Sequence, residues 1–232
     1  MKKVLTAALL CTVSAFAAWD KFPVIEYGKG EAKAFYYKSR QANDGDLDFD
    51  FAIRYSPLAN LELASYWGGI EGNYALGLRY QIIPVLSAGV DVGFPLPGTA
   101  WSFTPNAQFS TEVTSALSLG SNVEATISTK DADKTTNGID LAAGIELDLA
   151  LSEKSTIWVG FDFGMGVTDT DYDGNKVKAK EDGRGTKLSP GIGYIATISN
   201  LALGTSVGFD FGEKSGNKPF NTTVGLDAAV QF

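Results

Sequence analysis

The chain has 232 residues, of which 44% are hydrophobic, 12% aromatic and 20% charged, with a formal net charge of −8. Its mean hydropathy is +0.00, and the lack of repeated apolar runs of about 20 residues excludes a bundle of transmembrane helices. The many aromatic and aliphatic residues exclude a disordered chain, and the negative charge argues against a nucleic-acid partner. A mean of zero is still compatible with strict alternation of apolar and polar residues.

The N-terminal residues 1–17 have the pattern of a secretory signal peptide. Two lysines precede a short apolar region, and Ala15-Phe16-Ala17 fits the small-x-small cleavage rule. Cleavage would leave one domain over residues 18–232, without cysteine. It would also move the net charge from −8 to −10, because both lysines are removed.

The rest of the chain alternates apolar and polar residues with a period of two, which predicts strands with one apolar and one polar face. We expect about twelve strands, in chain order over residues 29–37, 46–55, 61–68, 73–82, 86–94, 101–110, 116–127, 139–151, 156–167, 187–198, 201–211 and 220–232. Short connections alternate with longer polar ones rich in Gly, Asn, Asp and Lys. This pattern is typical of an up-and-down antiparallel sheet.

Strand length separates two kinds of β protein. A secreted soluble sandwich also alternates, but its strands usually have about 5–6 residues, whereas a membrane-spanning strand needs about 9–11. The predicted strands mostly have the longer length. Aromatic residues also gather in two groups, as at the two interfaces of a bilayer. The group at the long-connection ends is Tyr36, Phe49, Trp67, Tyr74, Phe94, Trp101, Phe211 and Phe220, and the group at the short-turn ends is Tyr55, Tyr80, Phe109 and Phe232.

With these features the chain resembles bacterial outer-membrane β-barrel proteins of the porin-like kind, without indicating a subfamily. Phe232 fits the aromatic C-terminal residue that the barrel-assembly machinery reads in this class, although Val230 stands where many members have Tyr. The resemblance implies an all-β, antiparallel transmembrane barrel in the outer membrane, with short periplasmic turns and longer extracellular loops. It also implies contact with membrane lipid and lipopolysaccharide, but no oligomeric state.

Basic residues favour the longer connections, where phosphates of lipopolysaccharide are a natural counter-charge. Ordinary loop solubility is the simpler interpretation. The residues are Lys38, Arg40, Lys130, Lys134, Lys176, Lys178, Lys180, Arg184, Lys187, Lys214 and Lys218.

The sequence contains no histidine. Without His or a mature Cys, a catalytic triad and most transition-metal sites are excluded. Only a carboxylate-based glycosidase stays open, so we expect no enzyme and no cofactor.

In a barrel the polar face lines the lumen. An acidic lumen would favour cations. The inward acids are predicted to be Glu31, Asp48, Asp50, Glu62, Asp91, Glu124, Asp140, Glu146, Asp148, Asp162, Asp210 and Asp227, against the bases Lys33, Arg54 and Arg79. The inward glycines, predicted to leave room for water, are Gly77, Gly89, Gly93, Gly120, Gly144, Gly160, Gly164, Gly193, Gly204, Gly208 and Gly225.

One charged group can be placed more closely. The turn at 56–60 puts Arg54 opposite Glu62, and the loop at 68–72 puts Glu62 opposite Arg79. Bidentate Arg–carboxylate pairs then predict either a wall-stiffening ion network or a charged constriction. Trp158 also points inward by phase, and we expect it to narrow the same end.

The segment 168–186 contains Asp169, Asp171 and Asp173, a spacing that resembles the start of a Ca²⁺ loop. Lys180 stands where a bidentate acid is expected, and a solvated Asp/Gly loop explains the same residues. A Ca²⁺ site is therefore a weak hypothesis.

The leading functional hypothesis is a passive, mildly cation-preferring diffusion pore for small hydrophilic solutes. The competing hypothesis is a non-conducting barrel whose loops contact a partner, a surface or lipopolysaccharide. Fold does not decide between the two, because one architecture serves both.

Overall fold

The period-two segments form strands, because alternate side chains of an extended chain point to opposite faces. The computed structural model describes residues 21, 26–39, 48–68, 73–94, 101–128, 137–170, 176–177, 185–212 and 220–232. No helix within these ranges is long and apolar enough to cross a bilayer. The strands within them are β1 (Gly30–Ser39), β2 (Asp48–Leu58), β3 (Leu61–Gly68), β4 (Asn73–Ile83), β5 (Leu86–Phe94), β6 (Ser102–Thr114), β7 (Leu117–Ser128), β8 (Asn137–Ser152), β9 (Ser155–Thr170), β10 (Lys176–Val177), β11 (Lys187–Ile198), β12 (Leu201–Gly212) and β13 (Phe220–Gln231).

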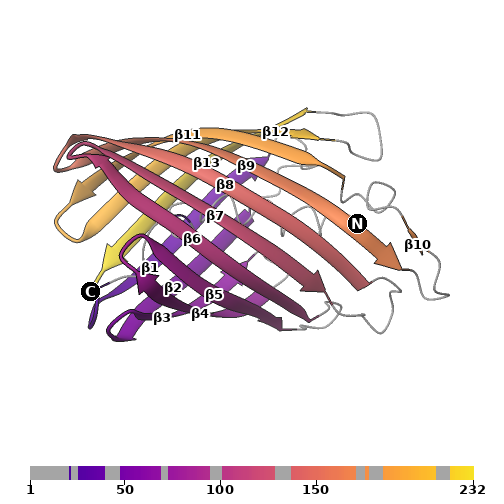
Figure 1. Ribbon diagram of the computed structural model, residues 1–232. Helices are drawn as coiled ribbons and strands as arrows, with labels where there is room; N and C mark the ends of the chain where they lie inside the picture. The colour runs from indigo at the N-terminus through magenta and orange to yellow at the C-terminus, as the bar shows by residue number, and fades with distance from the viewer. Residues whose placement is uncertain are drawn as a thin grey trace.

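The twelve long strands of the described chain form one closed antiparallel barrel. Each strand from β1 to β9 pairs with the next in sequence, β9 pairs with β11, and β13 pairs back with β1. The two-residue strand β10 extends the sheet from β9 alone. Figure 1 shows the strands tilted around a common axis. Closure satisfies the backbone groups of every long strand from both sides, so no sheet edge is left open.

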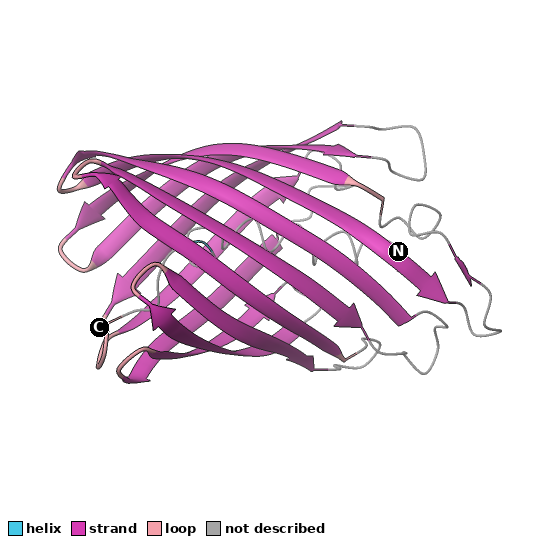
Figure 2. Cartoon of the chain, in the orientation of Figure 1, coloured by secondary structure: helices cyan, strands magenta, loops and turns pink. Residues whose placement is uncertain are grey.

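The short connections all lie at one end of the barrel, here named the short-turn end; the opposite end is named the long-loop end. Figure 2 shows these turns at the end where the C-terminus lies. Asn60 and Ser199 have φ values of 65° and 60°, as the primed turns that are favoured in two-residue hairpins require; the other short turns of the described chain contain no residue with positive φ. Most connections at the long-loop end fall outside the described residues. The short turns are at 59–60, 84–85, 115–116, 153–154 and 199–200.

The predicted architecture of about twelve strands is confirmed, and most strand ends agree within a few residues. The largest extension at the short-turn end is in β6, which continues to Thr114 instead of ending at residue 110. Thr111 and Glu112 pair with Leu119 and Ser118 of β7. Three of the four residues in this extension are polar, with Val113 the exception, so hydrophobic alternation gives only a weak signal for it.

The outward face is apolar and exposed, with aromatic residues toward its ends. At the long-loop end the rings of Trp67, Tyr74, Phe94 and Trp101 form a continuous row over β3, β4, β5 and the start of β6. Their centroids are 6.4, 5.6 and 5.1 Å apart in turn. At the short-turn end Tyr80 is 52% exposed. These rings therefore lie where a bilayer would have its two interfaces.

Two prolines interrupt the backbone ladder of the barrel wall, because proline has no N–H to donate. The β6–β7 register skips Thr104 and Pro105, and the β11–β12 register skips Ser189 and Pro190. Side chains cross both gaps. The Thr104 and Thr126 hydroxyls lie 3.1 Å apart, and Ser189 Oγ donates to Asp210 Oδ1 over 2.6 Å.

Candidate functional site

The inside of the barrel is the candidate site, because it reverses the usual arrangement of a soluble protein. Charged residues are buried within it, whereas large apolar residues of the same strands are exposed. Glu62 is 1% exposed and its neighbour in sequence, Leu63, is 45% exposed. Such an inversion suits a wall with lipid outside and polar groups inside.

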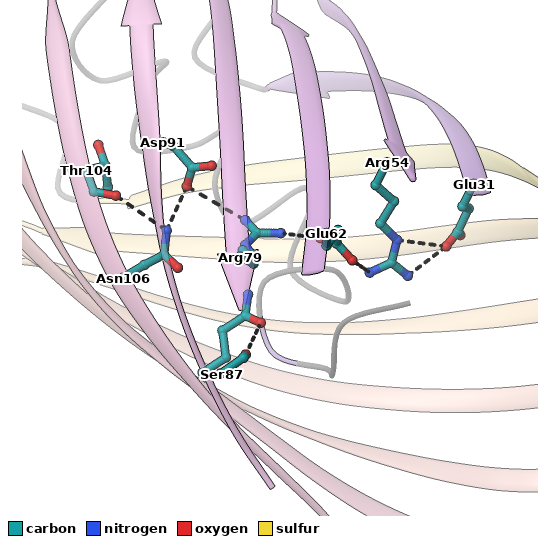
Figure 3. A network of polar contacts seen from close by, with 9 residues as sticks. Glu31, Arg54, Glu62, Arg79, Ser87, Asp91, Thr104 and Asn106 are labelled. Atoms are coloured by element: carbon teal, nitrogen blue, oxygen red, sulfur yellow. Dashed lines mark hydrogen bonds and ion pairs between the residues drawn. The ribbon is translucent and has the colours of Figure 1, made fainter. Parts of the chain in front are cut away.

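A network of alternating charges runs along the inner wall from β1 to β6, near the short-turn end (Figure 3). We name it the wall network; its members are Glu31, Arg54, Glu62, Arg79, Asp91 and Asn106. Arg54 donates to Glu31 Oε2 from Nη2 and Nε, over 2.7 and 3.1 Å. Its Nη1 reaches Glu62 Oε2 at 3.5 Å. Arg54 thus bridges two carboxylates.

Glu62 connects Arg54 to Arg79, because it accepts hydrogen bonds from both. Arg79 Nη1 donates to Glu62 Oε1 over 3.2 Å, and its Nη2 lies 3.7 Å from Asp91 Oδ2. Asn106 Nδ2 completes the run by donating to Asp91 Oδ2 over 2.8 Å. The Arg79 guanidinium also lies 5.9 Å from the centre of the Tyr66 ring, within cation–π range.

The strand register agrees with the predicted pair Glu62–Arg79 and differs from the predicted pair Arg54–Glu62. Glu62 lies directly opposite Arg79, as expected. Arg54, however, lies opposite Ala64 rather than Glu62, because β2 continues to a two-residue turn at 59–60 instead of ending before a 56–60 connection, and a bulge between Tyr55 and Leu58 then shifts the register by one. The Arg54–Glu62 contact is therefore diagonal, and the closest partner of Arg54 is Glu31 on β1. The structure brings Arg54, Glu62 and Arg79 together by this altered route.

Trp158 points inward, as its phase indicates, but belongs to the opposite wall. Trp158 lies on β9, which is six strands away from β3 around the closed barrel of twelve strands. The indole lies over Gly193, where an added Cβ would collide with it, and 3.3 Å from the Cβ position of Gly191. Trp158 is also the register partner of Asp148. The structure therefore does not place it in the wall network.

Most predicted lumen acids are inward, and several have cationic partners. Asp227 lies 3.5 Å from Lys33, and Asp210 lies 3.2 Å from Lys187. Lys187, grouped above with the basic residues of the longer connections, is the first residue of β11, as the predicted range 187–198 has it, and its ammonium lies beside an inward acid. Asp50, Asp140 and Glu146 are buried, at 0, 7 and 1% exposure. The side chain of Asp48 lies outside the described residues.

Lys21 is a lumen residue that the sequence pattern missed. Its side chain is 1% exposed and its ammonium lies 2.7 Å from Asp162 Oδ1. It precedes the first strand, so no periodicity marks its direction. Counting it with Lys187, the described lumen holds eleven predicted acids and five bases. The excess of acid is smaller than expected but persists.

Inward aromatics were also missed, although strand parity places them. Phe35 and Tyr37 follow Glu31 and Lys33 along the inner face of β1, are each 5% exposed, and have ring centroids 5.4 Å apart. The Phe35 ring occupies the space beside Gly225. The lumen thus contains apolar surface as well as charge.

The prediction that inward glycines leave room for water is wrong at several positions, because neighbouring side chains fill the space. An added Cβ would collide with Asp91 at Gly77, with Asp162 at Gly144, with Trp158 at Gly193 and with Asp227 at Gly204. Each of these glycines is the register partner of the residue it would strike. At Gly208 the space is open.

The weak Ca²⁺ hypothesis falls mostly outside the described residues, as do Asp171 and Asp173. Asp169 belongs to β9 by its backbone, where it pairs with Gly138 and Val177. Within the described part of the chain, no group of three or more acidic, His or Cys side chains is arranged to hold a metal ion. The loop site stays a prediction.

Fold and lumen together define the class: the chain has the fold of porin-like outer-membrane β-barrels. Residues 25–226 match the family described as "Putative MetA-pathway of phenol degradation", and the chain belongs to that family. No curated protein matches the chain.

Solved structures share the fold at low sequence identity. An outer membrane channel from Pseudomonas putida F1 superposes with a TM-score of 0.68 at 13% identity, over 91% of this chain and 98% of that one. The NanC porin has a TM-score of 0.60 at 8% identity, covering 87% and 98%. The KdgM porin has 0.59 at 12% identity, covering 87% and 99%.

Proposed function

We propose that the protein is a passive, mildly cation-preferring diffusion pore for small hydrophilic solutes, resident in the outer membrane. The observation that carries the proposal is the acidic excess of the inner wall, eleven acids against five bases in the described lumen. Fixed negative charge raises the local concentration of cations and lowers that of anions. The channel and porin names of the similar structures support a pore in general.

The wall network is proposed as the charged constriction. Its two arginines are held by carboxylates on both sides, so the guanidinium groups keep fixed positions on one wall. Trp158 and the Glu146–Asp148 pair line the opposite wall, and Glu146 interacts electrostatically with Lys33 across the lumen. Charge on facing walls would let the barrel select ions without a binding pocket.

Single-channel recording of the refolded protein in a planar bilayer tests the pore directly. We expect ohmic current steps, and in a KCl gradient a reversal potential displaced toward the cation value. Absence of steps at every salt concentration would instead support the non-conducting barrel, with its loops contacting a partner or lipopolysaccharide. A reversal potential on the anion side would remove the cation preference.

A second candidate is passage of small aromatic solutes. The inward rings of Phe35, Tyr37 and Tyr66 favour it, as does the family description. Phenol added to the bath should then reduce the ionic current through the wild-type pore. The reduction should weaken in Phe35→Ala, and an unchanged reduction in that variant would count against aromatic binding at these rings.

The C-terminal residue provides a test of assembly. Phe232 exchanges two backbone hydrogen bonds with Gly30, of 2.8 and 2.9 Å, and its ring lies beside that glycine. We propose that the assembly machinery reads this residue. Deleting it should lower the folded, heat-modifiable fraction on a gel from cell envelopes.

The matched variant is Phe232→Ala, which retains the backbone bonds and removes the ring. A loss shared by both variants assigns the effect to the side chain. A loss confined to the deletion assigns it to barrel closure, and equal amounts of folded protein in all three would refute the role of the terminal residue.

A further inference from the structure

The ammonium group of Lys21 lies among three carboxylates on the β8–β9 side of the lumen. Lys21 Nζ is 2.7 Å from Asp162 Oδ1 and interacts electrostatically with Glu146 and Asp148. The backbone carbonyl of Lys21 lies over Gly120 and its side-chain Cε over Gly144, and an added Cβ at either glycine would collide with it. The wall is therefore shaped around a four-carbon alkylammonium.

Hydrogen-bond acceptors outnumber donors around this ammonium. Among the described residues, Asn122 Oδ1, both Glu146 carboxylate oxygens and Asp148 Oδ1 are closed to solvent and accept no hydrogen bond, and Lys21 Nζ, which forms the ion pair with Asp162, donates no hydrogen bond to them. Glu146 and Asn122 are 1% and 6% exposed. Buried acceptors without donors are costly, and Asn122 adds an uncharged acceptor to the acidic ones.

The register places these acceptors on one continuous piece of wall. Gly144 of β8 lies opposite both Asn122 of β7 and Asp162 of β9. Glu146 and Asp148 follow Gly144 on the same face of β8. We name Asn122, Glu146, Asp148 and Asp162 the carboxylate patch.

Trp158 borders the patch and favours an organic cation. A Cβ on Gly160 would lie 3.4 Å from both Glu146 Oε2 and Trp158 Cζ3, so the carboxylate and the indole are neighbours. The indole also covers Gly193 and lies near the Cβ position of Gly191. Carboxylates beside an indole suit a cation with both N–H donors and alkyl surface, and no described acidic group is arranged for a metal ion.

We propose that the carboxylate patch is a binding subsite for small primary alkylammonium ions, and that Lys21 occupies it as a tethered ligand. When the Lys21 side chain is removed, a free primary alkylammonium ion binds to the carboxylate patch in its place. The inference rests on the proposed pore only for the route by which an external ion reaches the subsite.

The test is chemical complementation of Lys21→Ala in detergent-purified protein. The probe is n-butylammonium, which is the lysine side chain without its backbone, and binding is measured by titration calorimetry. We expect Lys21→Ala to bind the probe at least about tenfold more tightly than wild type, and adding Glu146→Gln to reverse that gain. n-Butanol, the neutral analogue, should not bind.

Asp210→Asn in the Lys21→Ala background is the matched control, since it neutralises a lumen acid that is paired with Lys187 outside the patch. It should leave binding unchanged, and heat-modifiability on a gel verifies that each variant is folded. Equal affinity in wild type and Lys21→Ala, retention of binding in Glu146→Gln, or equal binding of n-butanol would each overturn the proposal.

Planar-bilayer recordings distinguish failure of the proposed subsite from failure of the proposed pore. Conduction without n-butylammonium binding would leave the pore intact and refute the subsite. Binding without conduction would leave the subsite intact and refute the pore. With both in place, the probe should block current through Lys21→Ala at lower concentration than through wild type.

Discussion

Replacing Glu62 by alanine is expected to lower the free energy of unfolding by about 3–5 kcal/mol, the usual cost of removing one partner from a buried ion group. Glu62 is 1% exposed and accepts from both Arg54 and Arg79. Its loss leaves two guanidinium groups facing each other without the intervening charge. Urea-induced unfolding of the refolded barrel in detergent micelles, followed by tryptophan fluorescence, measures the change.

Two further variants give this prediction its control. Glu112 lies exposed at the short-turn end of β6, so Glu112→Ala should change stability by no more than about 0.5 kcal/mol. Glu62→Gln retains the shape and one acceptor oxygen, so its loss should fall between those of the two alanine variants. If Glu62→Ala unfolds at the wild-type urea concentration, the wall network does not stabilise the barrel.

Neutralising both arginines in Arg54→Gln/Arg79→Gln is expected to shift ion selectivity further toward cations. At about 6 Å in a water-filled lumen, one unit charge is worth about 0.7 kcal/mol, or about a factor of three in local ion concentration. Removing two positive charges leaves Glu31, Glu62 and Asp91 uncompensated in this part of the wall. The cation-to-anion permeability ratio should therefore rise at least about threefold, as read from the reversal potential in a KCl gradient.

The control for selectivity is Lys29→Gln. Lys29 precedes β1, is 59% exposed, and pairs with Glu26 outside the lumen, so its neutralisation should leave the reversal potential unchanged. High salt should also reduce the effect of the double variant, since screening shortens the range of the fixed charges. An unchanged reversal potential in Arg54→Gln/Arg79→Gln would show that the constriction lies elsewhere.

The strands could be predicted from the sequence because each carries its own periodic signal. The bounds of β3, β5 and β11 agree with the predicted ranges 61–68, 86–94 and 187–198. One face of each strand is apolar and the other polar, so alternation fixes both extent and direction. The end of β6 shows the limit of predicting strands from alternation, because pairing with β7 keeps its last residues in the strand.

The site was only partly predictable, for reasons that differ between residues. Glu62 and Arg79 were found together because a hairpin with regular register joins their strands. The contact of Arg54 with Glu62 was predicted as well, but its diagonal geometry and the closer contact with Glu31 were not, because the tight turn at 59–60 and the bulge after Tyr55 set a register that no residue pattern marks. Lys21 lies outside any strand, and only the folded barrel shows which wall it approaches.

The pairing of inward glycines with large inward neighbours has a consequence for the inner surface of the barrel. Asp91, Asp162, Asp227 and Trp158 each cover the bare backbone of the glycine across the ladder. These side chains therefore run tangentially along the wall instead of radially toward the axis. Each of these side chains lies over its glycine on the inner wall, and a methyl group at any of these glycines would displace its partner from that position.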